Sequence, residues 1–250
     1  MKKLIYLVCI LSCVTCDTEN APNCIQTQGT IISTQFEVPF FLKIRIEDDV
    51  SLVIKQGATQ QVIIETGENL LNDVSVTVEG EILVIRDGNR CNFVRDYGIT
   101  KAIVTTPDLI EIRNSSEFHV VGEGVLRFPF LQLVSNTTGG IENSRKSVDF
   151  TMTVECEDFR VAANGFSAFY IDGFAEKASI GFEDEVPRFE GQNLIINDLF
   201  ILQRSANIMI VNPQERLRGE IRGTGNVISV NRPPIVEVEE FFTGRLIFQD

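Results

Sequence analysis

The chain has 250 residues, of which 44% are hydrophobic, a composition typical of folded proteins rather than disordered ones. It carries 35 acidic and 22 basic residues, for a net charge of −13. So acidic a chain is not suited to binding nucleic acid or an anionic lipid surface through charge.

The first fifteen residues predict a lipoprotein signal peptide. Lys2 and Lys3 precede an apolar run, residues 4–11, that is too short to span a bilayer. The run leads to cysteines, which resembles the lipobox of bacterial lipoproteins, where a cysteine is acylated and becomes the new N-terminus. Cys16 is the predicted lipidated residue because a polar segment follows it at once. Cys13 fits the lipobox spacing better and stays an alternative, as does an ordinary cleaved signal.

Cleavage before Cys16 would remove two lysines and no acids, so the net charge would fall from −13 to −15. The N-terminal lipid, rather than charge, would then attach the chain to a membrane. We expect a lipoprotein of the cell envelope, in the outer membrane, on its surface or periplasmic face. Residues 16–35 would be an acidic tether.

The remaining cysteines predict one disulfide. The envelope is an oxidising compartment, and a Cys24–Cys91 bridge would fasten the leader to a turn-rich stretch of the body. Cys156 would stay free as a small core residue. No metal site is expected, because the sequence has no CxxC motif and His119 is its only histidine. We expect no cofactor.

The body, residues 36–240, has the composition of strands and turns. Short runs rich in Val, Ile, Phe and Thr alternate with Gly, Asn, Asp and Pro. Residues 68–72 are the best helical segment and reach only a turn or two, which excludes helical bundles and α/β folds. The clearest early strands are predicted at 51–55, 61–65, 74–78 and 82–85.

The second half repeats about every 20 residues, the spacing of one coil of a β-solenoid. Because one coil cannot bury its inward residues alone, stacked coils would share a core, and Asn or Asp side chains could support the turns. The two apolar rows are Val161, Ile180, Ile201, Ile221 and Phe169, Phe189, Met209, Ile228. The polar row is Asp172, Gln192, Asn212 and Asn231.

The predicted fold class is all-β: a right-handed β-helix or β-solenoid-like stack of short strands preceded by a strand meander. The meander is expected in residues 36–88, which lack the repeat. A β-sandwich with evenly spaced strands is the alternative. Residues 232–234 (Arg-Pro-Pro) would break the last coil, and residues 241–250 would form a C-terminal edge segment with a strand over 244–248.

The stretches 41–44, 50–57, 62–65 and 69–71 resemble the opening of the DUF2807 family, described as the "putative auto-transporter adhesin, head GIN domain". Residues 223–227 (Gly-Thr-Gly-Asn-Val) resemble the glycine-led strand starts of its repeats. The resemblance covers residues 36–238. It implies a β-helix-like fold in secreted or lipid-anchored proteins of Bacteroidetes-type bacteria, and it brings no catalytic residues. The proline-broken end and the cysteine pair depart from it.

No catalytic motif was found, so we predict that the protein is not an enzyme. His119 alternates with apolar residues, which favours a place on a strand face over a catalytic role. A glycan-active β-helix enzyme is the alternative, because such enzymes place acids and a basic residue on adjacent coils. Its candidate residues would be Asp172, Asp198 and Glu220, with Arg204 and Arg222.

The leading hypothesis is a binding module of adhesin type, held at the envelope by its lipid. Its target would be a surface glycan, a matrix protein or an envelope protein. Phe166 and Tyr170, beside Phe169, are candidates for an aromatic binding platform, although core packing is the expected fate of each. A periplasmic scaffold lipoprotein needs the same signal and fold and remains an alternative.

Overall fold

The computed structural model describes residues 23–89, 91–138 and 145–249. The predicted signal peptide, Cys13 and Cys16 lie outside these residues. Within them, 17 strands form one mixed sheet, and no helix is long and apolar enough to cross a membrane. The strands are β1 Ile31–Phe36, β2 Lys43–Asp48, β3 Ser51–Gln56, β4 Gln61–Gly67, β5 Val74–Glu79, β6 Ile82–Asp87, β7 Lys101–Thr106, β8 Glu111–Ser116, β9 Val120–Leu126, β10 Phe130–Ser135, β11 Asp149–Ala163, β12 Ala168–Phe182, β13 Arg188–Gln203, β14 Met209–Ile221, β15 Val227–Ser229, β16 Ile235–Glu240 and β17 Leu246–Phe248. The four early strands predicted from sequence are confirmed. The segment 68–72 runs into a single 3₁₀ turn, η2 (Leu71–Asp73), and a second 3₁₀ turn, η1 (Asn23–Ile25), begins the described chain.

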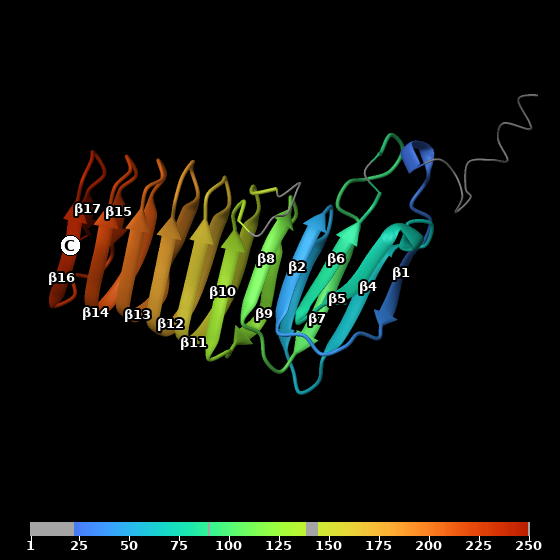
Figure 1. Cartoon of the computed structure of the whole chain (residues 1–250), viewed down its shortest axis with the longest axis horizontal. Helices are drawn as coiled ribbons and strands as arrows, with labels where there is room; N and C mark the ends of the chain where they lie inside the picture. Colours follow the sequence, from blue (N-terminus) through green and yellow to red (C-terminus); the bar gives the residue numbers. More distant parts are fainter. Residues whose placement is uncertain (1–22, 90, 139–144, 250) are drawn as a thin grey trace, which may run out of the picture.

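The long strands β11 to β14 lie side by side in parallel, each bonded to the next (Figure 1). Each long strand contributes two halves to two parallel rows of strands. In the first row, the initial halves continue the line of β3 and β9 and lead to β15 and β17. In the second row, the later halves continue β2, β8 and β10 and lead to β16.

The repeat seen in the sequence is the register of this stack. Val161 lies opposite Ile180, and Ile180 opposite Ile201. The second apolar row holds as far as Met209, which lies opposite Phe189, and only the last member of each row is wrong, by one or two positions. In the first apolar row the cause is a register shift between β13 and β14. Ile221 therefore lies opposite Gln203. Ile228 lies opposite Ile210, outside the core.

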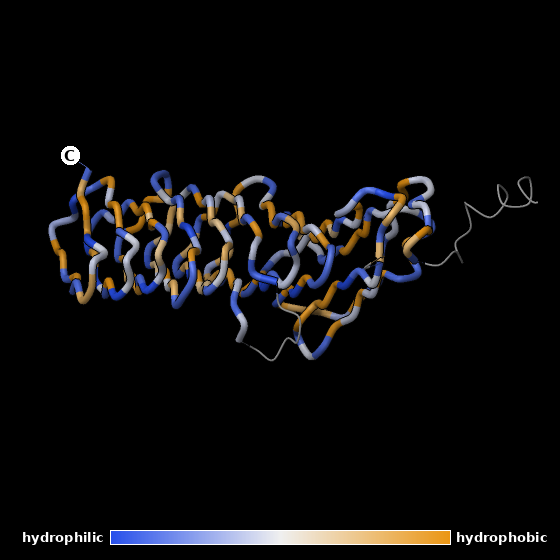
Figure 2. The backbone as a smooth tube through the Cα atoms, turned by 90° about the horizontal axis from the view of Figure 1, so that it is seen from above, coloured by the Kyte–Doolittle hydropathy of each residue, from blue (hydrophilic) through white to orange (hydrophobic). Residues whose placement is uncertain are grey.

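The second apolar row is an internal stack of rings. Phe150, Phe169 and Phe189 follow one another in register and are fully buried. The rings of Phe150 and Phe169 stack with centroids 4.8 Å apart and planes 13° apart. Both rows of strands contribute to one core that runs the length of the molecule, and hydrophobic residues recur along the whole tube in Figure 2.

Two asparagines of the predicted polar row bind the corners of neighbouring coils. Asn212 Nδ2 donates to the Gln192 carbonyl at 3.0 Å, one coil earlier. Asn231 Nδ2 donates to the Pro213 carbonyl at 2.6 Å. These bonds fix the corners at which the chain passes from the first row of strands to the second, as expected of polar residues at stacked turns.

The early part of the chain is not a simple meander. β2 lies between β6 and β8, and β3 lies between β7 and β9, all in parallel. The chain first forms β2 and β3, then leaves this coil through β4 and β5. It returns to add β6 and β7 on one side of the coil and β8 and β9 on the other. Among the strands that the structure describes, antiparallel pairing is confined to β1 with β4, β4 with β7, and β5 with β6. Residues 23–36, assigned largely to the tether from sequence, contribute η1 and β1 to this end.

The far end of the stack is formed by β16 and β17, the predicted terminal strand being three residues long. β16 carries Glu237, Glu239 and Glu240. Glu240 lies opposite the buried Ile221, so it occupies an inward position at the open end, where its carboxylate lies 3.5 Å from Arg245. Charges of this kind discourage another strand from pairing with an exposed edge.

Candidate functional site

The end of the stack near the N-terminus carries a cross-linked cap, which we define as residues 23–28, 88–89 and 91–98. Cys24 and Cys91, paired from the sequence, are joined by a disulfide that closes a separation of 67 residues. The backbone N–H of Phe93 donates to the Cys24 carbonyl at 3.0 Å. The cap therefore joins η1 to the segment between β6 and β7.

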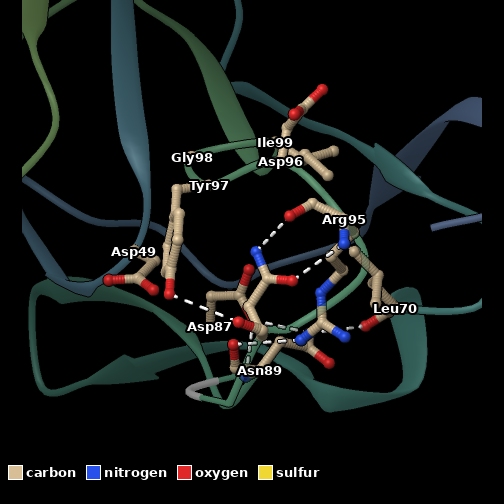
Figure 3. A pocket seen from close by; sticks show the side chains of 10 residues that line it. Asp49, Leu70, Asp87, Asn89, Arg95, Asp96, Tyr97, Gly98 and Ile99 are labelled. Carbon is tan, nitrogen blue, oxygen red and sulfur yellow. Dashed lines mark hydrogen bonds between the residues drawn. The ribbon is translucent and has the colours of Figure 1, made fainter. Parts of the chain in front are cut away.

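Arg95 holds the cap together from inside (Figure 3). Its guanidinium donates to the carbonyls of Asn23, Gln26 and Cys91 at 2.7, 2.9 and 2.9 Å. Asn92 Oδ1 accepts the Arg95 backbone N–H at 2.9 Å and so fixes the turn that presents this arginine. Because its guanidinium donates to these backbone carbonyls, the Arg95 side chain points into the cap.

A buried polar cluster supports the cap from below. Asp87 accepts from Thr100 at 2.5 Å and from the backbone and side-chain nitrogens of Asn89 at 2.8 and 2.6 Å. The cavity beside it, of about 20 Å³, has room for one water. Burial raises the pKa of nearby Asp49, opposed by Arg145, whose guanidinium lies 2.9 Å from the carboxylate. This cluster is a support rather than a ligand site.

Apolar side chains project from the cap. Ile25, Phe93, Val94 and Tyr97, which we call the tip, are 52%, 81%, 53% and 69% exposed. Gly98 closes the loop at a φ of +68°, with the Phe118 ring in the place a Cβ would need. The tip was not predicted from the sequence. The available signal was three apolar residues clustered beside a cysteine in a segment otherwise rich in turn formers.

A second candidate surface is the outer side of the second row of strands. A charged row runs along it, formed by Asp158, Lys177, Asp198 and Arg216, each opposite the next. Its charges alternate in sign from coil to coil. Asp198 also accepts from Arg218 Nε at 3.2 Å, a contact that crosses from one coil to the next.

Aromatic rings lie beside the charged row. The Arg160 guanidinium lies over the Phe130 ring at 5.0 Å, and that of Arg218 lies over the Phe200 ring at 5.4 Å. A shallow depression of about 270 Å³ opens between Arg160, Lys177, Asp198 and Arg218. It offers donors, acceptors and a flat ring within one small area, the groups that bind a polar ligand.

A third depression, of about 520 Å³, lies next to the charged row, where β11 and β12 pass from the first row of strands to the second. Glu155, Glu157 and Glu176 line it with Arg127 and Phe174. Cys156, which is free as the sequence predicted, is only 4% exposed there. Burial raises the pKa of its thiol to about 12, so the thiol is neutral and unreactive.

The alternative catalytic residues do not form a common site. Asp172 is exposed on the first row of strands, opposite Thr153. Asp198 lies on the second row in the charged row. Glu220 lies on the same strand as Arg216, four residues further along β14. The hydrogen bond from Arg222 lowers the pKa of Glu220. Arg204 and Arg222 follow paired strand ends, as their spacing suggested.

Three aromatic or imidazole positions differ from their expected places. His119 is exposed in the turn before β9 rather than on a strand face. Phe166 and Tyr170 are 62% and 42% exposed, so neither packs in the core as expected. Phe169 between them is fully buried. Along the described ranges, no cluster of three or more potential metal ligands occurs.

Comparison with known proteins identifies relatives of the fold. The family described as the "putative auto-transporter adhesin, head GIN domain", DUF2807, matches residues 40–233. The crystal structure titled a putative adhesin from Bacteroides fragilis is 18% identical, with a TM-score of 0.77 over 89% of this chain and 99% of that one. Two structures from Parabacteroides distasonis, titled a putative adhesin and a putative lipid binding protein, are each 13% identical with TM-scores of 0.62, over 89% of this chain and 99% and 98% of theirs. No match was found among curated proteins.

Proposed function

Because this chain belongs to the DUF2807 family, we propose that it is a lipid-anchored, adhesin-like binding module of the cell envelope with no catalytic site. The stacked strands act as a rigid β-solenoid, a right-handed β-helix that presents one face to a target.

The observation that carries the proposal is the regularity of the charged row. Asp158, Lys177, Asp198 and Arg216 occupy equivalent positions on four successive coils. Adjacent strands lie about 4.8 Å apart, so acids and bases alternate along the row at a fixed short interval. An extended polar polymer, such as a glycan, could meet hydrogen-bond acceptors and donors in turn along such a surface.

Binding by this face can be tested by removing one exposed charge from it. Lys177→Gln takes away the cation between two acids of the charged row, and we expect weaker retention on arrays of bacterial and host glycans. Lys55→Gln is the matched control, since Lys55 is a half-buried lysine at the surface of the first row of strands, paired with Glu123 at 2.7 Å. Equal retention of both variants and the unmodified chain would show that the charged row is not the binding surface.

Attachment through Cys16 is tested separately. Cys16→Ser should release the protein from membranes into the soluble fraction. Continued attachment of the variant, removed only by Cys13→Ser, would move the lipidated position to Cys13. Release by neither substitution would contradict lipid anchoring.

Protease treatment of intact cells distinguishes the two envelope locations. Degradation without opening the outer membrane supports an adhesin-like role at the surface. Protection until the membrane is opened would replace that role with a periplasmic scaffold, which needs the same anchor and the same rigid stack. A stable co-purifying envelope protein would then be expected.

A further inference from the structure

The position of the tip suggests a role for it that depends on the proposed anchor. The described chain starts at Asn23, immediately before the disulfide cysteine Cys24. Seven residue steps separate Asn23 from Cys16, and a fully extended chain covers about 25 Å in that distance. A lipid on Cys16 would therefore keep the cap within about 25 Å of the membrane surface.

We propose that the tip is a membrane-contacting surface, which seats the N-terminal end of the stack on the bilayer that holds the lipid and directs the C-terminal end away from it. This inference rests on the lipid anchor proposed above. Aromatic rings with a polar group, such as that of Tyr97, favour the boundary between acyl chains and water. Phe93, Val94 and Ile25 supply the apolar surface next to it.

The way the tip is held fits such a contact. The Cys24–Cys91 bridge and the carbonyl contacts of Arg95 order the loop before it meets a partner. A preordered loop loses less conformational entropy on binding than a flexible one. The disulfide and the hydrogen bonds of Arg95 thus hold the apolar side chains of the tip in exposed positions.

Charge indicates what kind of bilayer contact this is. The Arg95 guanidinium faces inward, and Asp96 is exposed at the tip. The contact therefore depends on apolar insertion and not on attraction to anionic headgroups. It should be at least as strong on zwitterionic phosphatidylcholine as on anionic lipid, which repels this acidic chain, and salt should not weaken it.

The alternative is a stack that lies flat along the same edge. The cap follows β6, a strand of the second row. The turns after β11, β12 and β16 also follow strands of this row, which are parallel to β6, so they lie at the same edge of the stack as the cap (Figure 1). Phe166 and Phe242 are exposed on these turns. Between them, however, Glu183, Asp184 and Glu185 form an exposed acidic turn. Three carboxylates would have to approach the headgroups if the molecule lay flat, which disfavours that orientation.

The experiment uses the full lipidated chain in phosphatidylcholine vesicles with brominated acyl chains, which quench nearby tryptophan. The chain has no tryptophan, so one substitution gives one reporter. Phe93→Trp places the reporter at the tip, and Phe242→Trp is the matched control at the distal turn. Phe166→Trp reports on the middle of the edge. All three phenylalanines are exposed, so the core is untouched.

We expect the Phe93→Trp emission to shift to shorter wavelength and to lose most of its intensity in brominated vesicles, with or without high salt. Phe166→Trp and Phe242→Trp should keep theirs. Flotation with the vesicles but no quenching of Phe93→Trp would overturn the tip contact while leaving the anchor intact. Quenching at all three positions would overturn the end-on orientation, and quenching abolished by salt would overturn the apolar mode. Failure of the chain to float would reject the anchor and this inference together.

Discussion

Replacing Phe169 by alanine tests whether Phe150, Phe169 and Phe189 form a continuous stack inside the core. The Phe169 side chain is fully buried, with the Phe150 ring at 4.8 Å and the Phe182 ring at 6.2 Å. Removing a buried phenylalanine costs about 3–5 kcal/mol in transfer and cavity terms. Loss of the stacked pair contributes about 0.5–1.5 kcal/mol beyond the buried area. We therefore expect the free energy of unfolding to fall by about 5 kcal/mol.

Urea unfolding followed by far-ultraviolet circular dichroism measures this loss. The matched control is Tyr170→Ala, which removes an aromatic ring one position along the same strand. Tyr170 points outward and is 42% exposed, so its removal should change the free energy of unfolding by less than about 1 kcal/mol. If the two variants lost equal stability, the inward and outward alternation along β12, and with it the internal stack, would be wrong.

Three further predictions concern the cap and the titratable groups. The Cys24→Ser, Cys91→Ser double variant should lose about 4 kcal/mol of stability, because the bridge closes a separation of 67 residues in the unfolded chain; an unfolding midpoint in urea equal to that of the unmodified protein would contradict this. Cys156 should resist a thiol reagent in the native protein and react once the chain is unfolded, as read by mass spectrometry of its peptide; rapid native labelling would contradict its burial. Because burial raises the pKa of Asp49 in the folded state, the folded form favours the protonated carboxyl, so stability relative to Asp49→Asn should fall as pH rises from 3.8 through the raised pKa. A difference between the two proteins that does not change over this pH range would show that Arg145 fully offsets the effect of burial on the Asp49 carboxyl.

The sequence predicted most of the stack because its information is local and repetitive. A coil of about 20 residues places equivalent side chains opposite one another, so Phe169 and Phe189 can be paired by counting alone. The counting still places Met209 opposite Phe189, but it fails later in β14, whose corner has fewer residues than that of β13, and the last member of each apolar row is displaced. A register shift of one residue reverses the face of a strand, which is why Ile228 lies outside and Val227 inside.

The disulfide was also accessible from the sequence, because few cysteines are available and only two lie in suitable loops. The tip was not. Phe93 and Tyr97 have the same composition as core residues, and only the inward turn of Arg95 and the bridge to Cys24 decide that they face solvent. Asp172 and Asp198 likewise lie apart because the first half of β12 enters one row of strands and the later half of β13 enters the other.

What the amino-acid sequence by itself determined is the class of fold, its repeat and its acidic character, since alternation, turn residues and composition act between near neighbours. The tertiary structure alone decided the order of the first coils. Ile44 pairs with Leu83 on one side and with Ile112 on the other, partners 39 and 68 residues away, and no period in the chain connects them. The physical reason is that β2 gains hydrogen bonds and buried apolar surface on both sides when the chain returns around it. Such a choice depends on the energy of the whole assembly and leaves no local signal.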